Sequence, residues 1–385
     1  MILKGKLIII LIIIFAHVFV ACNKNMSKIV LKKEKTYYCN IENFDSVKKS
    51  LKSFQVIDYE GFATLSYVNL LDSTINFHVF DTVDGSQNHK SYHLNNVIRK
   101  HDFDNAHSFS VCLIVNNDSV FILRDNDNYV YLFNVYDKII DSFPLYNPNS
   151  EKNYICYSVD MKYSYPYLIL PANQRVLVNN NTSEYYSLNG IILNIKDKTI
   201  EKFGRNSQKE ILNNIYYIGL YNYFDIQNDK IIFSASEDNN IYEYNIGKDE
   251  YKIFNAKSKY IKSVIPIPDS IAFDFSEKYK FKIENPYYRR PVFSVADDYI
   301  LRVAQIRGKV FEDDGFYKQK KTHQEYSIIV MDKNYKIIDE VLLSPANSDD
   351  FILPTKEGIF LINKDFSNFS NDYKLCLDLY RIKKR

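Results

Sequence analysis

A cluster of tyrosine and arginine residues is the part of the sequence best suited to binding chemistry. It comprises Tyr287, Tyr288, Arg289 and Arg290, with Arg302 a short distance further along the chain. Arginine forks donate paired hydrogen bonds to carboxylate or phosphate, and tyrosine faces stack on sugar rings or peptide planes. These five residues therefore form the predicted ligand site, suited to an anionic or glycan ligand. The alternative is that the arginines form structural pairs with carboxylates of neighbouring strands.

Three further stretches contain side chains that metals prefer, but none has the spacing of a known metal site. The densest set combines imidazole and carboxylate groups, which could hold zinc. Residues 125–128 offer oxygen ligands for calcium but lack the glycine and the final glutamate of an EF-hand loop, and residues 312–315 are similar. We therefore expect polar loops, no metal site and no cofactor, with calcium as the alternative cofactor. The densest set is His89, His93, His101, Asp102, Asp104 and His107.

The common catalytic and nucleotide-binding motifs are absent from the sequence. No two of the 10 glycines are closer than seven positions, whereas phosphate-binding loops need glycines two or five apart. The sequence has no Gly-x-Ser-x-Gly elbow, no His-Glu-x-x-His helix and no Cys-x-x-Cys pair. No catalytic residue is assigned.

The elements that must position the tyrosine and arginine cluster are short β-strands. Runs of four to eight residues rich in Ile, Val, Tyr and Phe are bounded by Asn, Asp and Lys, which is an all-β pattern. One unit recurs: a polar pair, a short apolar strand, and then a hairpin with Asp, Asn, Lys or Gly at its turn. Examples of the first part are residues 117–123 and 228–233, and of the hairpin residues 130–140, 191–200, 241–254 and 328–341.

Counting these units predicts a six-bladed β-propeller, with seven blades possible and two stacked β-sandwiches as the competing architecture. A ring of blades buries the apolar face of each sheet against its neighbours. Residues 42–53 are expected to form an outer strand that pairs with residues 375–382 and so closes the ring, with a helical turn as the alternative. The six units are 61–94, 118–145, 166–203, 228–256, 297–343 and 356–382.

The N-terminus is typical of a bacterial lipoprotein. Lys4 and Lys6 precede an apolar run from Leu7 to Ala21, which has the length of a signal peptide. Phe19-Val20-Ala21-Cys22 follows the pattern of a lipobox, although Phe19 replaces the usual leucine; an ordinary cleaved signal is the alternative. The predicted division is a signal peptide over 1–21, a tether over 22–35 that carries lipid on Cys22, and a propeller over 36–385.

The net charge of the chain and its expected cellular compartment limit the kinds of partner it can bind. Removal of Lys4 and Lys6 leaves 47 basic residues against 47 acidic ones, and a neutral chain is a poor ligand for nucleic acid. No acidic run follows Cys22, which favours an outer-membrane protein that faces the periplasm. Disulfides are possible there, yet we expect buried thiols because several cysteines lie in apolar runs. The cysteines in question are Cys39, Cys112, Cys156 and Cys376.

Several of these patterns together resemble the uncharacterised bacterial lipoproteins with a six-bladed, TolB-like β-propeller. The resemblance rests on the lipobox, on residues 53–55, 65–69 and 117–122, and on Asn285-Pro286-Tyr287-Tyr288-Arg289. It implies the fold and the anchor and implies no catalytic residue.

The function expected from sequence is a lipid-anchored cell-envelope propeller that acts as a non-catalytic binding or scaffolding module. Its partners would be the membrane, through the lipid, and an unknown envelope protein, peptide or glycan. A metal-dependent propeller hydrolase or lactonase is the alternative, because propellers support both roles.

Overall fold

The computed structural model describes the β-sheet part of the chain, and the all-β prediction is confirmed. Cys22, the signal peptide, residues 42–53, residues 97–107 and the acidic loops at 125–128 and 312–315 lie outside the described residues. No helix among the described residues has the length and hydrophobicity to cross a membrane. The structure describes residues 29–40, 55–59, 62–69, 74–80, 87–93, 109–116, 118–124, 129–134, 138–145, 152–155, 161–171, 173–179, 182–187, 190–203, 223–236, 238–248, 250–265, 267–271, 274–294, 298–310, 322–344, 347–356, 358–363 and 374–384.

Six antiparallel sheets of four strands make up most of the described structure. Four of them are built from strands that follow one another directly in the chain, because short apolar runs separated by polar turns pair with their nearest neighbours. Sheets 1 to 3 are β2 (Gln55–Tyr59), β3 (Phe62–Asn69), β4 (Thr74–Phe80) and β5 (Gln87–His93); β6 (Phe109–Ile114), β7 (Ser119–Arg124), β8 (Tyr129–Asn134) and β9 (Lys138–Pro144); and β11 (Lys162–Ser164), β12 (Tyr167–Leu170), β15 (Gly190–Asn194) and β16 (Thr199–Phe203).

The second half of the chain forms sheets 4 to 6 in the same way. Sheet 6 differs because its outermost strand comes from the beginning of the described chain. These sheets are β17 (Tyr223–Gln227), β18 (Lys230–Ser234), β19 (Asn240–Asn245) and β20 (Glu250–Asn255); β21 (Tyr287–Phe293), β22 (Ile300–Val310), β23 (Thr322–Met331) and β24 (Ile337–Leu342); and β25 (Asn347–Thr355), β26 (Gly358–Asn363) and β27 (Lys374–Lys384) with β1 (Ile29–Asn40).

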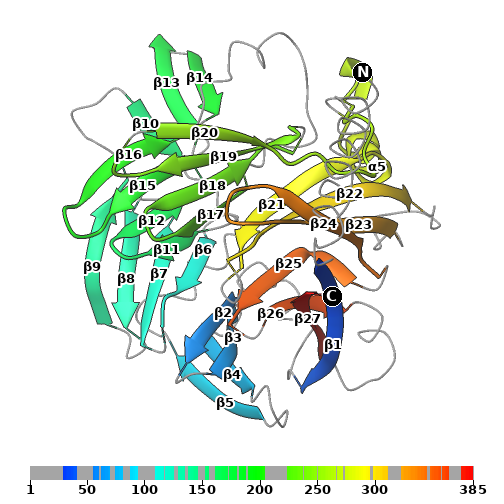
Figure 1. Cartoon of the computed structure of the whole chain (residues 1–385). Helices are drawn as coiled ribbons and strands as arrows, with labels where there is room; N and C mark the ends of the chain where they lie inside the picture. The colour runs from blue at the N-terminus through cyan, green and yellow to red at the C-terminus, as the bar shows by residue number, and fades with distance from the viewer. Residues whose placement is uncertain are drawn as a thin grey trace, which may run out of the picture.

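The six sheets form a closed ring. Sheet 1 contacts sheets 2 and 6, sheet 4 contacts sheets 3 and 5, and sheet 5 contacts sheet 6, while sheets 2 and 3 share one apolar core. Figure 1 shows the colours running once around this ring, from blue through green and yellow to orange, until β1 lies beside β27. The first strands of neighbouring sheets contact one another, so they line the middle of the ring.

The strand that closes the ring is β1, which begins at Ile29. It pairs antiparallel with β27, from Ile29 opposite Lys384 to Asn40 opposite Lys374. Residues 29–35, expected to be tether, are therefore the first part of this strand, and the closing role expected of residues 42–53 belongs to an earlier segment. Leu31 and Tyr37 of β1 are buried, and their burial fixes the position of the strand in the sheet. The lysines of β1 alone would favour a solvent-exposed segment.

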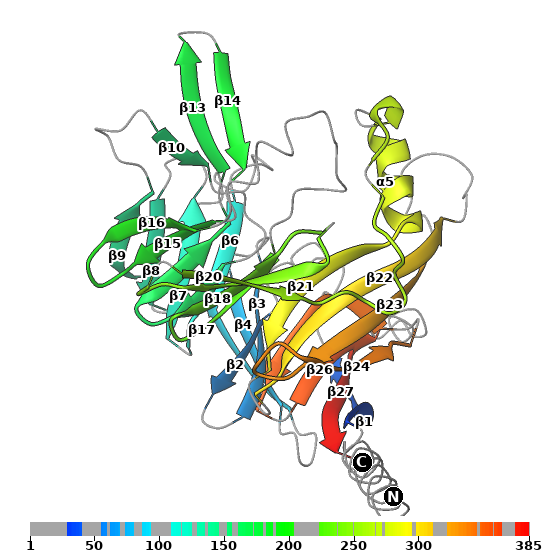
Figure 2. The ribbon, with the colours of Figure 1, turned by 45° about the horizontal axis from the view of Figure 1, so that its top comes forward.

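Two additions project from the same end of the ring (Figure 2). One is a three-stranded sheet in which β10 (Lys152–Ile155) pairs with the hairpin of β13 (Asn173–Asn179) and β14 (Thr182–Ser187). The other is helix α5 (Phe275–Glu284), which contacts β22 and β23. Its strand β10 precedes β11, and its hairpin β13–β14 is inserted between β12 and β15 of sheet 3, so the extra sheet adds no seventh member to the ring.

Turn chemistry follows the prediction in part. Asn228 and Asp298 adopt positive φ angles of 57° and 53° at the polar pairs that open their units. Lys198 and Tyr335 do the same in the predicted hairpin turns, where Asn or Asp was the residue type expected in this conformation. The hairpins themselves were predicted correctly, because apolar alternation on both sides of a turn is a strong local signal.

The thiol prediction is confirmed for one cysteine. Cys376 is a free thiol in β27 and only 1% exposed. Burial, with the nearby Asp378 carboxylate, raises the pKa of this thiol to about 11. It therefore stays protonated and behaves as a small apolar side chain. The side chains of Cys39, Cys112 and Cys156 are not among those described.

Candidate functional site

The structure places the predicted tyrosine and arginine cluster on β21 and β22 of sheet 5. Tyr288 and Arg302 lie together, and Arg302 is the largest fully buried side chain described. A β-bulge between Tyr288 and Pro291 shifts the pairing of β21 with β22. Tyr287 and Tyr288 are consecutive and both buried, so both faces of β21 are covered at this point.

The guanidinium of Arg302 ties sheet 5 to the turn between β18 and β19 in sheet 4. It donates hydrogen bonds to the backbone carbonyls of Asn239 at 3.0 Å, Asp238 at 2.5 Å, Ala256 at 3.3 Å and Ala235 at 3.4 Å. Loss of water around this buried cation lowers its pKa to about 10. Its donors are directed at backbone of the same chain, so the structure gives Arg302 a role in joining sheets.

Tyr288 completes this junction. Its ring lies 3.9 Å from the Arg302 guanidinium carbon, a close cation–π contact. Its hydroxyl donates to Asn239 Oδ1 at 2.7 Å and accepts from the Ser258 backbone amide at 3.1 Å. Burial raises the pKa of the phenol. One side chain thus connects β21 to two segments of sheet 4.

Arg289 belongs to a second group that also includes Tyr287 and Tyr326. Its guanidinium carbon lies 5.2 Å from the Tyr287 ring and 5.8 Å from the Tyr326 ring. Arg289 and Arg290 are both half-buried, unlike the other three predicted residues. They are the members of the predicted ligand site that keep surface accessible to a partner.

Helix α5 covers the Tyr287 side of the strand. Gln305 in β22 donates its amide to the carbonyls of Lys282, Ile283 and Asn285, at 2.9, 2.9 and 3.0 Å. These carbonyls end the helix, so Gln305 supplies hydrogen bonds that a helix C-terminus otherwise lacks. The helix is thereby held beside the strands that carry the arginines.

Two buried carboxylates, Asp225 near the middle of the ring and Glu340 on an outer strand, were not singled out in the sequence. Asp225 of β17 is 8% exposed and accepts a hydrogen bond from the Phe293 amide of β21 at 2.9 Å. Its other oxygen lies 3.8 Å from the Lys162 ammonium of β11. Asp225 therefore links the first strands of sheets 3, 4 and 5. The sequence signal that could have identified Asp225 is its position as a single carboxylate inside an otherwise uncharged strand.

Glu340 of β24 forms the other buried polar junction. It is 5% exposed and accepts hydrogen bonds from the hydroxyls of Ser258 and Ser327, both at 2.6 Å, and from the Lys259 amide at 2.7 Å. It lines a cavity of about 650 Å³ between β24 and the chain that follows β20. Lys257 and Lys262 also line this cavity.

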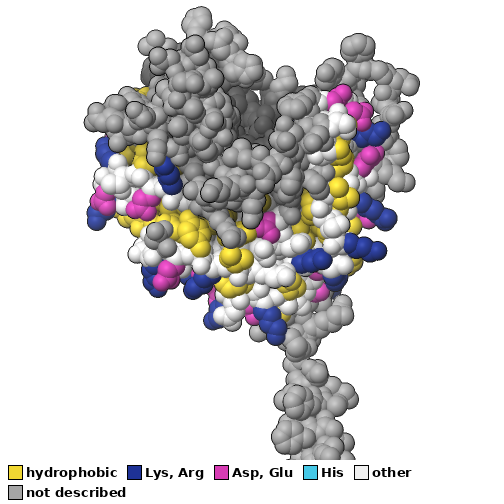
Figure 3. All heavy atoms as spheres, turned by 90° about the horizontal axis from the view of Figure 1, so that it is seen from above, with side chains coloured by type: hydrophobic (Ala, Val, Ile, Leu, Met, Phe, Trp, Pro, Cys, Tyr) yellow, Lys and Arg dark blue, Asp and Glu magenta, His cyan; other side chains and the backbone are white. Residues whose placement is uncertain are grey.

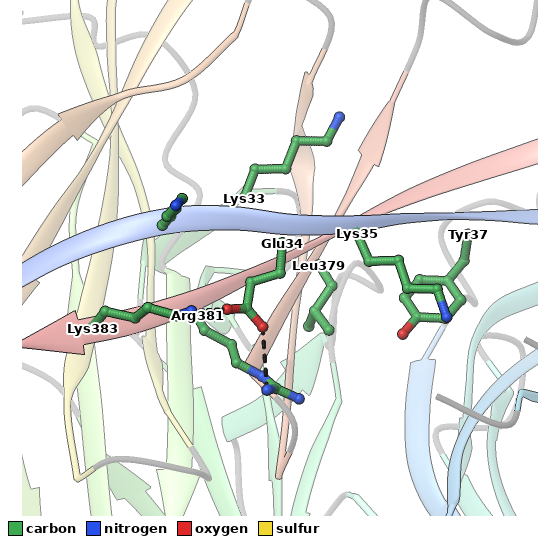
Figure 4. Close-up of a pocket in the computed structure, with 8 residues that line it drawn as sticks. Lys33, Glu34, Lys35, Tyr37, Leu379, Arg381 and Lys383 are labelled. Carbon is green, nitrogen blue, oxygen red and sulfur yellow. Dashed lines mark ion pairs between the residues drawn. The ribbon is translucent and has the colours of Figure 1, made fainter. Parts of the chain in front are cut away.

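A second groove, of about 410 Å³, lies along β1 and β27 at the outer edge of sheet 6 (Figure 4). Glu34 points toward Arg381 and Lys383 of β27, and the Arg381 guanidinium lies 3.2 Å from it. The hydrogen bond from Lys383 lowers the pKa of the Glu34 carboxyl. The residues that line this groove are Lys32, Lys33, Glu34, Lys35, Tyr37, Leu379, Arg381 and Lys383.

The described residues contain no group of three or more His, Cys, Asp or Glu side chains placed to hold a metal. The histidine set and the two acidic loops of the sequence analysis lie outside that part of the chain or have undescribed side chains. Over the described part of the face in Figure 3, basic and acidic side chains are interspersed with apolar ones.

Comparison with known proteins identifies the fold. No family model and no curated protein matches the sequence. The chain is similar to a solved member of the DUF4221 family from Bacteroides vulgatus, with a TM-score of 0.64 and 14% identity over 94% of this chain and 100% of that one. At this identity the similarity shows a shared fold and no more.

Two more distant solved structures were also found. One is a protein described as exported from Bacteroides fragilis, with a TM-score of 0.48 and 13% identity over 94% of this chain and 97% of that one. The other is regucalcin, a calcium-binding protein from Agrobacterium tumefaciens, with a TM-score of 0.40 and 9% identity over 86% and 91% of the two chains.

Proposed function

We propose that the ring is a six-bladed β-propeller, held at a membrane of the cell envelope by lipid on Cys22, that acts as a non-catalytic binding module. The observation that carries the proposal is the closure of the ring by β1. Because β1 begins at Ile29, the first strand of the fold follows Cys22 by seven positions. The expected anchor and the ring are thus nearly continuous in the chain.

The chemistry of the described buried groups supports binding over catalysis. Arg302, Asp225 and Glu340 make hydrogen bonds across sheets, and each is less than 10% exposed. A group that acts on a substrate has to reach it, and these groups hold the ring together instead. The half-buried Arg289 and Arg290 remain as the contacts for an anionic or glycan partner.

The anchor is tested by Cys22→Ala, with Cys376→Ala as the matched control. Several acyl chains on one cysteine hold a protein stably, so removal of their attachment point should release it from membranes. Cys376 is buried in β27, and its replacement should leave the protein in the membrane fraction. Equal membrane association of Cys22→Ala and the parent chain would contradict the anchor.

The non-catalytic role is tested by elemental analysis of the purified protein, followed by melting with added calcium or zinc. The proposal expects no stoichiometric metal and no shift in melting temperature. A stoichiometric metal that raises the melting temperature would support a metal-dependent propeller hydrolase instead. Arg289→Gln with Arg290→Gln then tests the binding surface, through loss of partner crosslinking in intact cells.

A further inference from the structure

The groove between β1 and β27 carries an excess of positive charge. On the side of β1 that Figure 4 shows, Arg381 and Lys383 lie beside the carboxylate of Glu34, and the Lys35 side chain extends toward Tyr37. Lys32, opposite Arg381 in the strand register, adds a fourth cation to the lining. With Lys33 set aside, the described lining residues of this groove of about 410 Å³ are four cations and one carboxylate, whose charges sum to +3.

Lys33 belongs to the other side of the strand. Its ammonium lies 2.7 Å from the carboxylate of Asp378, which also accepts hydrogen bonds from Thr36 and Asn363. Asp378 is only 1% exposed, so this pair is structural. The cations of the groove are therefore separate from the contact that holds β1 in place.

Glu34 positions part of the groove. The β-bulge between Lys33 and Lys35 gives Glu34 no partner in the pairing with β27. Its two oxygens contact Lys383 and Arg381 respectively, and both cations remain about half exposed. The carboxylate thus holds two long side chains side by side without covering them.

Protection of a sheet edge does not account for this charge. Outer strands need charged side chains to prevent pairing with other molecules, but either sign serves that purpose. Outer strands β9, β16 and β20 each carry one lysine and one acidic residue, and β24 carries two acidic residues. Strand β1 carries three lysines and one glutamate, and β27 adds Arg381 and Lys383 beside them.

The position of the groove indicates what it contacts. Seven residues, fully extended, span at most about 25 Å, so lipid on Cys22 would keep the start of β1 within that distance of the bilayer. We propose that the β1–β27 groove rests on the anionic phosphate headgroups of the membrane to which the chain is anchored. This inference rests on the proposed anchor, and it assigns the face of the ring that is turned to the lipid.

The test uses the full lipid-modified protein in vesicles of phosphatidylcholine alone or mixed with phosphatidylglycerol. An amine-reactive label is followed at each lysine by mass spectrometry. Lys32, Lys35 and Lys383 should label about fivefold more slowly on the anionic vesicles, the factor expected for one charge held at an anionic surface. The exposed Lys138, Lys202 and Lys252 of other outer strands should label equally on both. High salt should abolish the difference.

A matched pair of variants sharpens the result. Glu34→Gln raises the charge of the groove to +4 and should increase the protection on anionic vesicles. Glu250→Gln makes the same change on outer strand β20 and should have no effect. Equal labelling on both vesicle types, with the protein bound to both, would overturn the inference while leaving the anchor intact.

Two further outcomes are decisive. Protection of the same lysines by inorganic phosphate without vesicles would assign the groove to a soluble anion and overturn the membrane contact. If the full protein does not bind neutral vesicles, the proposed anchor fails, and the membrane contact of the groove is then tested by sedimentation with anionic vesicles. Binding to these vesicles that is lost in the triple variant Lys32→Gln, Lys35→Gln and Lys383→Gln would support the contact between the groove and the headgroups. No binding of the parent protein to anionic vesicles would overturn that contact.

Discussion

Two junctions of the ring both contain an apolar core but differ in the buried polar contacts added to it. Between sheets 4 and 5, a buried arginine and two buried glutamates cross from one sheet to the other. Between sheets 2 and 3, the shared core consists of buried Leu, Ile, Val, Phe and Met side chains. Both junctions join antiparallel sheets of four strands, so the same architecture is compatible with an apolar core alone or with an apolar core crossed by directional polar contacts.

The polar junction depends on the hydrogen bonds that its buried charged groups make across the two sheets. Arg302 meets backbone carbonyls and the Tyr288 ring, and Glu340 meets two serine hydroxyls. A buried charge is costly when one partner is missing, so each contact fixes the relative position of the two sheets. We infer that this junction is sensitive to the loss of single polar atoms.

The apolar junction depends on volume. Leu168 and Leu170 of sheet 3 pack in one cluster with Phe121 and Leu123 of sheet 2, all at most 1% exposed. An ion pair between Lys198 and Asp141 at 2.7 Å lies at the rim, partly exposed to solvent. This junction should be sensitive to cavities and almost insensitive to its one described rim charge pair.

The largest effect is expected from Arg302→Met. The change keeps an apolar stem but leaves several buried carbonyls without a donor, so the free energy of unfolding should fall by about 3–5 kcal/mol. Denaturant titration measures it. Arg307→Met in the same strand is the control, because Arg307 is exposed and pairs with Glu325 at 2.8 Å. Equal midpoints for the two variants would contradict the polar junction.

Leu168→Ala tests the apolar junction. Truncation of a fully buried leucine leaves a cavity, and the free energy of unfolding should fall by about 3 kcal/mol. Ile139→Ala serves as the control, since Ile139 is 61% exposed on β9 and should tolerate the change. A small loss at Leu168, similar to that at Ile139, would show that the shared core is not formed as described.

Tyr335→Phe removes one oxygen atom from the polar junction. Tyr335 stacks on Phe254 at 3.8 Å and donates its hydroxyl to the buried Glu243 at 2.7 Å. The ring stays, the hydrogen bond is lost, and the free energy of unfolding should fall by about 1–2 kcal/mol. Tyr165→Phe, at a side chain 68% exposed, should change nothing measurable. An unchanged free energy of unfolding in both Tyr335→Phe and Tyr165→Phe would contradict the sensitivity of the polar junction to single polar atoms.

The smallest effect is expected at the rim of the apolar junction. The hydrogen bond from Lys198 lowers the pKa of Asp141 below its usual 3.8, so the pair stabilises the fold above that pH. Its contribution is lost as the pH falls through the lowered pKa of the folded state. Lys198→Gln should lower the free energy of unfolding by less than about 1 kcal/mol at neutral pH. Parent and variant should converge in acid, and a constant difference down to acid pH would contradict the pair.

The sequence predicted the outer hairpins of the sheets better than their first strands. Residues 191–200 and 241–254 alternate apolar and polar side chains around a turn, and both form the expected hairpins. The first strands were missed because they are short or interrupted by charge: β11 has three residues, and β17 contains Asp225. Their neighbours across the ring stabilise them, and local sequence carries no record of those neighbours.

The site was predicted less completely than the fold. The predicted cluster divides into two groups, Tyr288 with Arg302 and Arg289 with Tyr287. Arg302 meets backbone carbonyls of residues 235–256, which have no sequence signature. Strand β1 was mistaken in part for a tether because its lysines suggest solvent. Its partner lies about 340 positions further along the chain, where no local pattern indicates the pairing.

The central claim is that β1 both closes the ring and continues directly from the proposed anchor. Lys32→Cys with Arg381→Cys tests it, because these exposed residues face each other across the two strands within reach of a disulfide. Oxidation of the purified protein should link them, as mapped by mass spectrometry. The out-of-register pair Lys35→Cys with Lys383→Cys should stay unlinked. No disulfide in the first variant, or equal yields in both, would contradict the closure of the ring by β1.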